Sequence, residues 1–433
     1  FLVANNKVAI SGFITDAETG EALIHATIAD RKNCVGVVAN NFGHYVMKIN
    51  EKEEVQIECS YIGYQSQVVK INVTKDTVIN FYLKSGTEIE EIVINSDQRN
   101  SYQNQPATGI IEMKASMVEK LPSLLGEQDL ARMLQLMPGI QSGKEGAGGL
   151  FVRGGTNDQN LILLDGLPIY NANHIGGFVS IFNPSSINYL KLYKSGFPAK
   201  YGGRLSSILE VRMKNGNMQK REGSYSFGTL TGNFSCEGPL KKDTSSFIIA
   251  GRRTVYDLFV SAYNYLSTDG KYNGGYNLWD INAKYNKKLD EETRIYISFY
   301  KGEDKIYRSA KEENNINDTI YKTSDRYNNS WGNTTASLRL NKVYSGKTFA
   351  NYTLGVSNYH FKIGEDIKLK NGHKTMGSVN SLFYTSITDY LFSADFEHLL
   401  TKQHFLQFGA QTTLHQFSPS NNKMKRVENS VLI

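Results

Sequence analysis

Residues 148–204 decide the fold of this chain. Four short stretches follow one another in a fixed order: Gly148-Gly-Leu-Phe-Val-Arg-Gly-Gly, Asn160-Leu-Ile-Leu-Leu-Asp-Gly-Leu-Pro-Ile-Tyr, Gly176-Gly-Phe-Val-Ser-Ile-Phe-Asn-Pro and Gly196-Phe-Pro-Ala-Lys-Tyr-Gly-Gly-Arg. Short apolar runs bounded by Gly, Asn and Pro predict strands that are joined by tight turns. The segment is therefore expected to be a compact, strand-rich unit.

A single helix is predicted just before this segment, over residues 126–137. Leu130, Met133, Leu134 and Met137 repeat at helical spacing, and Pro138 follows as a stop. Strands are expected at 150–153, 161–165, 187–193 and 206–213. Residues 106–215 are therefore predicted to form one α+β domain.

The order of these motifs resembles the plug domain of the TonB-dependent outer-membrane receptors. The resemblance covers 106–215, and its most specific parts are Leu134-Gln-Leu-Met-Pro-Gly-Ile, Arg153-Gly-Gly, Leu164-Asp-Gly and Tyr201-Gly-Gly-Arg. In that family the plug sits inside a large β-barrel and gates the uptake of scarce nutrients. The resemblance thus implies these plug-motif residues: Arg153, Gly154, Gly155, Asp165, Gly166, Tyr201, Gly202, Gly203 and Arg204.

Residues 1–84 are predicted to form a small β-sandwich, because about seven short strands recur at roughly ten-residue spacing. The pattern resembles the carboxypeptidase-regulatory-like (transthyretin-like) domain found ahead of many receptors from Bacteroidetes-type bacteria. The resemblance rests on Gly12, Asp16, Gly20, residues 41–45 and residues 60–64. The stretch lacks the His-x-x-Glu spacing of a zinc peptidase, so it is not read as an enzyme. A plain structural module and a specific docking role both remain open.

Residues 85–105 are polar and read as a linker, interrupted by one apolar and acidic segment. Its position just before the plug matches the place where this receptor family carries its TonB box, which adds a strand to an inner-membrane-anchored partner. A first plug strand or a last sandwich strand is the competing interpretation. The candidate box consists of Ile89, Glu90, Glu91, Ile92, Val93, Ile94 and Asn95.

Residues 216–433 alternate between apolar and polar side chains, strand by strand. In 277–286, Trp279 and Ile281 share one face while Asp280 and Asn282 share the other. Short turns alternate with long polar connections, which are expected as loops at 304–326 and 363–376. This combination is typical of a transmembrane β-barrel with short periplasmic turns. A soluble sandwich would also alternate, but it has no reason to separate short from long connections.

The fold class is therefore mainly β: a sandwich, an α+β plug, and the first part of an antiparallel transmembrane barrel. About nine barrel strands fit before residue 433, whereas plugged transporters have about 22. Because backbone groups of a spanning strand must be paired in lipid, this stretch is expected to be a portion of a truncated or longer product. Alone, the 433 residues are expected neither to close a barrel nor to support uptake.

Composition excludes several classes of function. The net charge of +6 is small and no basic run occurs, so no nucleic-acid partner is expected. No run of about 18 apolar residues predicts a membrane-spanning helix. The Gly-rich stretch 143–155 lacks the Gly-Lys-Ser/Thr ending of a phosphate loop. We find no catalytic constellation, metal site or cofactor motif. Among the three cysteines, a Cys34–Cys59 bridge is possible but undecided.

The outward tip of the plug is the best candidate for contacts with a substrate. Aromatic and amide side chains there suit sugars or peptides, although ordinary turn packing explains them equally well. The candidates are Tyr170, Asn171, Asn173, His174 and Phe178. Arg153 and Arg204 are further expected to pair with barrel carboxylates such as Asp395 or Glu397, or else to be solvated.

The resemblance implies a receptor in the outer membrane of a Gram-negative cell, with its N-terminal domain and plug facing the periplasm. Its expected partners are a TonB-type energy-transducing protein, outer-membrane lipid, a surface lipoprotein such as many of these receptors pair with, and a nutrient. Iron–siderophore, cobalamin, glycan and peptide importers share these motifs, so the nutrient stays open. The alternatives are a non-transporting surface or regulatory protein and a soluble carbohydrate-binding protein.

Overall fold

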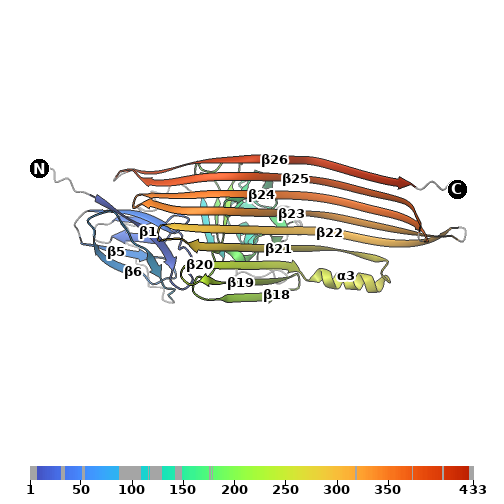
Figure 1. Cartoon of the computed structure of the whole chain (residues 1–433), viewed down its shortest axis with the longest axis horizontal. Helices are drawn as coiled ribbons and strands as arrows, with labels where there is room; N and C mark the ends of the chain where they lie inside the picture. The colour runs from blue at the N-terminus through green and yellow to red at the C-terminus, as the bar shows by residue number, and fades with distance from the viewer. Residues whose placement is uncertain are drawn as a thin grey trace.

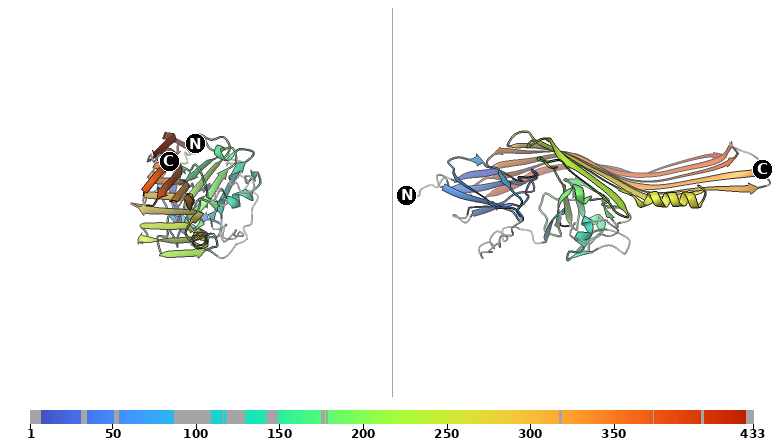
Figure 2. Two further views of the ribbon diagram at one scale, coloured as in Figure 1. Left: turned by 90° about the vertical axis from the view of Figure 1, so that its right-hand side faces the viewer. Right: turned by 90° about the horizontal axis from the view of Figure 1, so that it is seen from below.

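The structure is a computed structural model that describes residues 7–30, 35–50, 54–86, 109–115, 117, 129–141, 149–174, 177, 179–316, 319–372, 374–401 and 404–428. Strands dominate it. One broad, curved sheet runs along the whole molecule, and two smaller bodies lie against one side of that sheet (Figures 1 and 2). The N-terminal body lies at one end of the long strands, and the second body lies near their middle.

The N-terminal body is the expected β-sandwich. One sheet contains β1 (Lys7–Asp16), β4 (His44–Asn50), β7 (Thr77–Val78) and β8 (Phe81–Leu83), and the other contains β2 (Thr27–Asp30), β3 (Val35–Val38), β5 (Glu54–Ser60) and β6 (Gln67–Asn72). Ile10, Ile28, Tyr45 and Ile57 fill the space between the sheets. Cys59 is a free thiol in this core, where burial raises its pKa to about 12, and Cys34 lies outside the described residues.

The second body has the predicted α+β composition. Its five-stranded sheet has the order β13-β12-β17-β16-β9. The strands are β9 (Ile110–Lys114), β12 (Leu161–Leu164), β13 (Leu167–Pro168), β16 (Ile187–Tyr193) and β17 (Ile208–Met213). Two short hairpins accompany the sheet: β10 (Ile140–Gln141) with β11 (Phe151–Val152), and β14 (Asn173–His174) with β15 (Val179–Ser180).

The predicted helix is present as α2 (Leu130–Gln135), and it is shorter than the expected 126–137. Asp129 caps it, because its Oδ1 accepts hydrogen bonds from the backbone N–H groups of Ala131 at 2.7 Å and Arg132 at 3.0 Å. Residues 121–128 lie outside the described part. Leu130 and Leu134 are buried in the plug core, as their helical spacing predicts.

Nine strands form the large sheet in the described part of the chain, each antiparallel to the next in sequence. They are β18 (Glu222–Phe227), β19 (Thr231–Lys241), β20 (Ser245–Thr254), β21 (Tyr272–Lys288), β22 (Thr293–Ile316), β23 (Thr319–Ser345), β24 (Thr348–Asn371), β25 (Lys374–Leu399) and β26 (Phe405–Glu428). The sheet resembles part of a barrel, which confirms the predicted fold class.

The expected long loops at 304–326 and 363–376 were wrong. Those residues continue the strands, so that β22 pairs with β23 as far as Ile316 and Thr319, and β24 pairs with β25 as far as Asn371 and Lys374. About 10 residues suffice to cross a bilayer, and β23 has 27. The polar hairpins therefore extend well past the membrane, because backbone pairing continues where the side chains no longer face lipid.

The two faces of the large sheet differ as the alternation predicts. Leu338 and Phe392 on the outer face are 47% and 45% exposed, whereas Arg339 on the inner face is buried. The polar inner face lies against the plug, and the apolar outer face is free for lipid. The alternation of 277–286 is confirmed as well, since Asp280 and Asn282 are buried.

The helix α3 (Tyr256–Ser267) was not predicted from the sequence, and it lies in the connection between β20 and β21. It lies along β21 at the end opposite the sandwich (Figure 1). The Asn264 side-chain amide donates to the carbonyl oxygen of Gly274 at 2.9 Å. No helix in the described part of the chain is both long and apolar enough to span a membrane.

Candidate functional site

The glycine motifs of the plug build sharp turns. Asp165 and Gly166 form the two-residue connection between β12 and β13, and both have positive φ, 48° and 89°. Two positive φ angles are required by the hairpin turn that Asp-Gly favours. Arg153 and Gly154 adopt φ of 49° and 83° after β11. The turn motif therefore fixes where the Asp165 side chain can point.

Asp165 is placed against the inner face of the large sheet. Its Oδ2 lies 3.0 Å from Nζ of Lys284 and accepts a hydrogen bond from Ser298 Oγ at 2.7 Å. Arg339 donates to the Asp165 backbone carbonyl. Asp165 is 1% exposed, and both cations are buried as well. One plug residue thus meets two cations from the barrel wall, Lys284 at its carboxylate and Arg339 at its backbone carbonyl.

This environment keeps Asp165 ionised. Burial alone would raise the pKa of its carboxyl, but the neighbouring Lys284 and Arg339 cations bring that pKa below its usual range. A buried carboxylate without such partners would be protonated or costly. The charges of the Asp165 carboxylate and of the two barrel cations therefore stabilise one another.

His174 forms a second connection from the plug to the barrel wall. Its Nδ1 lies 2.6 Å from Oδ2 of Asp304, and its Nε2 lies 3.5 Å from Oδ2 of Asp280. Arg252 pairs with the same Asp280 oxygen at 2.7 Å and donates to the carbonyl oxygen of Ser180 at 2.7 Å. Burial lowers the pKa of His174, but the two aspartates outweigh burial, so that the pKa is raised. The imidazolium form is favoured here.

Tyr170 and Asn171 also contact the barrel wall. The Tyr170 hydroxyl donates to Oδ2 of Asp389 at 2.5 Å, and His415 Nδ1 lies 2.7 Å from the other oxygen of that carboxylate. Asn333 donates its side-chain amide to the Asn171 carbonyl oxygen at 2.7 Å. These predicted substrate contacts therefore also attach the plug to the barrel. Their role toward a substrate stays a prediction.

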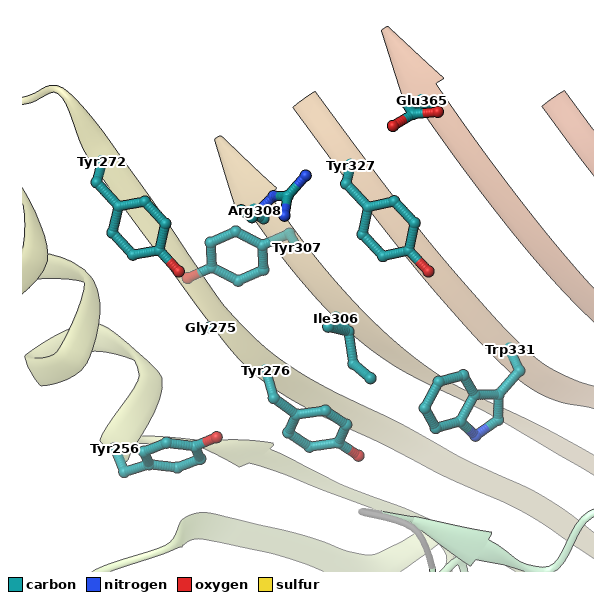
Figure 3. Close-up of a pocket in the computed structure, with 10 residues that line it drawn as sticks. All are labelled: Tyr256, Tyr272, Gly275, Tyr276, Ile306, Tyr307, Arg308, Tyr327, Trp331 and Glu365. Carbon is teal, nitrogen blue, oxygen red and sulfur yellow. The ribbon is translucent and has the colours of Figure 1, made fainter. Parts of the chain in front are cut away.

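An aromatic cavity of about 930 Å³ lies on the inner side of the long strands, beside α3. Figure 3 shows its rings gathered from neighbouring strands and from the start of α3. Arg308 at its rim pairs with Asp325 at 2.7 Å, which offsets the positive charge. Sequence analysis missed this site, because its members are spread over α3, β21, β22, β23 and β24, and four of them, including Tyr307, lie in segments that were expected to be loops. The six aromatic residues are Tyr256, Tyr272, Tyr276, Tyr307, Tyr327 and Trp331.

The cavity and the plug share one carboxylate. The Tyr276 hydroxyl donates to Oδ1 of Asp304, and the other oxygen of Asp304 contacts His174. Asp304 is 2% exposed, so little water screens the contact. A change at the Tyr276 ring can therefore reach His174 through a single side chain.

The expected pairs of Arg153 and Arg204 with barrel carboxylates are not formed. Arg153 donates to the Ser195 hydroxyl at 2.7 Å, and the Arg204 guanidinium lies 6.0 Å from the Tyr170 ring centroid. Both arginines are exposed, which agrees with the alternative that they are solvated. Glu397 instead accepts a hydrogen bond from Asn40 of the sandwich at 2.8 Å.

Other predicted residues have structural contacts or lie outside the described part. The Tyr201 hydroxyl donates to the Glu210 carboxylate at 2.7 Å. Burial would raise the pKa of Glu210, but the neighbouring Arg212 lowers it to about 2. Gly202 and Gly203 form the open turn that follows. Gly155 lies so close to Ser206 that a side chain would not fit. The candidate TonB box, 89–95, and Phe178 lie outside the described residues.

Two parts of the chain match known domain families. Residues 10–94 match the CarboxypepD_reg-like domain, and residues 117–207 match the TonB-dependent receptor plug domain. The chain carries the plug of a TonB-dependent receptor. Members of this family are receptors and transporters of the outer membrane and are not enzymes; the plug lies on the periplasmic side. The Bacteroidetes origin stays a prediction.

Solved structures of such receptors are similar to this chain. The siderophore receptor PirA from Acinetobacter baumannii is 13% identical with a TM-score of 0.37, and the match covers 71% of this chain and 61% of PirA. The ferric yersiniabactin uptake receptor FyuA from Yersinia pestis is 10% identical with a TM-score of 0.39, and the match covers 74% of this chain and 61% of FyuA. The chain thus spans less than two thirds of the length of either. No curated protein matches it in sequence.

Proposed function

We propose that this chain serves in the active, plug-gated uptake of a scarce or bulky nutrient, energised through the inner-membrane TonB complex. The proposal is supported above all by the carboxylate of Asp304, which contacts Tyr276 of the aromatic cavity and His174 of the plug. A ligand that stacks on the cavity rings would alter a contact that attaches the plug. Ligand binding and plug release would then be coupled.

The aromatic cavity suits the ligand-facing role. Tyrosine and tryptophan rings offer flat apolar faces and hydrogen-bond donors, which fix the orientation of ring-shaped solutes. The cavity lies beside α3, whose Tyr256 lines it (Figure 3), and α3 lies beyond the plug, seen from the sandwich (Figure 2). A solute that enters from outside would meet these rings before it meets the plug.

Opening the plug requires work, because its charged side chains lie in buried contacts with the barrel wall. Removing one partner from such a contact costs about 3–5 kcal/mol. The outer membrane holds neither ATP nor a useful ion gradient, so the work must arrive mechanically. The proposed TonB box, residues 89–95, lies between the sandwich and the first described plug strand in sequence. A pull on it would act directly on the plug.

Growth of a deletion strain tests the proposal. The strain is complemented with the full-length gene, with a Tyr276→Phe variant or with a Tyr272→Phe control. It is then grown with iron–siderophore, cobalamin, glycan or peptide as the limiting nutrient. We expect one nutrient to require the gene and an intact TonB complex, with reduced uptake for Tyr276→Phe only. Equal growth of all strains on every nutrient contradicts the proposal and favours a non-transporting surface protein.

A further inference from the structure

The N-terminal sandwich has a docking surface for the plug. His25 of the sandwich places its Nδ1 2.7 Å from Oε2 of Glu112 on β9. Glu112 also pairs with Lys191 of β16 at 2.5 Å. Sandwich, β9 and β16 therefore meet at one carboxylate.

Two sandwich rings contact a second residue of the same strand. The Nζ of Lys114 lies 4.1 Å from the ring centroid of Tyr61 and 5.4 Å from that of Tyr64. The Tyr64 hydroxyl donates to Oδ2 of Asp16 at 2.6 Å, which fixes the orientation of that ring. A lysine over aromatic rings makes favourable cation–π contacts. Glu112 and Lys114 are thus both held from the sandwich side.

The strand that receives these contacts is one of the two edge strands of the plug sheet. Among the described residues, β9 pairs with β16 alone, through Ile110–Lys114. It is also the first described plug strand after the linker. Short edge strands with a single neighbour open at low free energy. Additional contacts from the sandwich can therefore stabilise β9.

The sandwich itself rests on the barrel wall. Phe349 of β24 is 1% exposed and stacks on His44 with ring centroids 4.6 Å apart. Arg294 of β22 lies over the ring of Phe13 at 4.4 Å. Glu21 accepts hydrogen bonds from the Asn215 side chain at 3.0 Å and the Gly216 backbone at 3.1 Å. Because the sandwich is itself held against the barrel, its contacts attach β9 to the barrel and not only to a tethered domain.

We propose that the sandwich is a clamp, formed by His25, Tyr61 and Tyr64, that keeps β9 on the plug sheet. The linker leaves the sandwich after β8 and enters the plug at β9, so a pull on the linker acts on the clamped strand first. The clamp sets how readily β9 detaches, and it would prevent the plug from opening by thermal motion alone. This function of the sandwich needs neither a nutrient nor a TonB-type partner.

Hydrogen exchange of the full-length receptor, without ligand and without TonB, tests the clamp. The test variant carries His25→Gly and Tyr61→Leu. Glycine tolerates the φ of 60° at residue 25, and leucine keeps an apolar side chain against the sandwich core. Tyr82→Leu is the matched control, because Tyr82 is a half-exposed ring elsewhere on the same domain.

We expect the amide protection of residues 110–114 to fall about tenfold in the double variant, while that of β12, β17 and the control is unchanged. Equal protection of β9 in test and control variants, with the sandwich core still protected, overturns the proposal. If the double variant loses protection in the sandwich core, Lys114→Leu replaces it, because that change lies outside the sandwich. It must also lower β9 protection, by less than the double variant because the contact of His25 with Glu112 remains, and unchanged protection refutes the clamp.

Discussion

The plug contacts its two neighbours in different ways. Toward the barrel wall it uses fully buried charges, since Asp165, Lys284, His174 and Asp304 are all less than 5% exposed. Toward the sandwich it uses half-exposed groups: the side chains of His25 and Glu112 are 24% and 37% exposed. Water screens the second set and not the first. The barrel contacts therefore retain the plug, and the sandwich contacts are the ones that a moderate force breaks first.

The largest expected effect comes from Lys284→Met at the barrel contact. The change leaves the Asp165 carboxylate buried beside Ser298 and Arg339 with one cation fewer, which costs about 3 kcal/mol or more. Denaturant titration of the receptor, read from a probe in the plug, measures the loss.

Lys288→Met is the matched control for that experiment. Lys288 pairs with Glu291 at 2.6 Å, and the Glu291 side chain is 65% exposed. Such a pair contributes about 1 kcal/mol or less. Equal losses of stability in the two variants would show that a buried ion pair does not stabilise the receptor more than an exposed one.

The second prediction concerns pH. Because Asp304 and Asp280 raise the pKa of His174 in the folded state, the charged imidazole stabilises the seated plug fully below about pH 6.5. That stabilisation is lost as pH rises through the raised pKa. Thermal unfolding from pH 6 to 9 should therefore show a decline in the wild type that His174→Gln flattens. Parallel curves for both proteins would contradict this.

A smaller effect is expected at the contact between sandwich and barrel. Phe349→Leu keeps the apolar volume but removes the ring contacts with His44, Phe13 and Phe42, a loss of about 1 kcal/mol. Limited proteolysis should release the sandwich sooner, with the plug still retained. Phe227→Leu, at a ring 79% exposed on the outer face, serves as the control. Release at the same rate from both variants would argue against this anchor.

An effect of about the same size is expected for Tyr276→Phe. It removes one hydrogen bond to Asp304, worth about 1 kcal/mol or somewhat more because the acceptor is charged. Hydrogen exchange at His174 should increase slightly, whereas Tyr272→Phe, in the same cavity, should leave it unchanged. An increase in both variants would mean that the cavity and the plug are not linked through Asp304.

Much of the fold could be predicted from local sequence. The strands of the plug and the sandwich follow from short apolar runs between Gly, Asn and Pro, and the barrel faces follow from alternation such as that of 277–286. The loops at 304–326 and 363–376 were wrong because polar composition was read as irregular structure. Beyond the bilayer a strand can be polar on both faces and still pair its backbone. The same error concealed part of the aromatic cavity, because Tyr307 lies within 304–326.

The candidate site was predicted less completely than the fold. Asp165 and Gly166 were predicted as plug-motif residues, and Tyr170 and His174 were predicted as substrate contacts, which stays a prediction. Their partners were not, since the expected pairs of Arg153 and Arg204 with Asp395 and Glu397 do not match the contacts that these residues make. Sequence spacing limits which residues share a face of a strand, but it does not say which plug residue meets that face.

The sequence by itself determined the alternating strands, the Asp-Gly turn with two positive φ angles, and the domain types. Each of these depends on residues that are neighbours along the chain or two positions apart. Only the tertiary structure decided that His174 meets Asp304, 130 positions away, and that Tyr170 meets Asp389, 219 positions away. Those contacts depend on how the curved sheet wraps the plug, and buried charges contribute only where that packing brings opposite signs together.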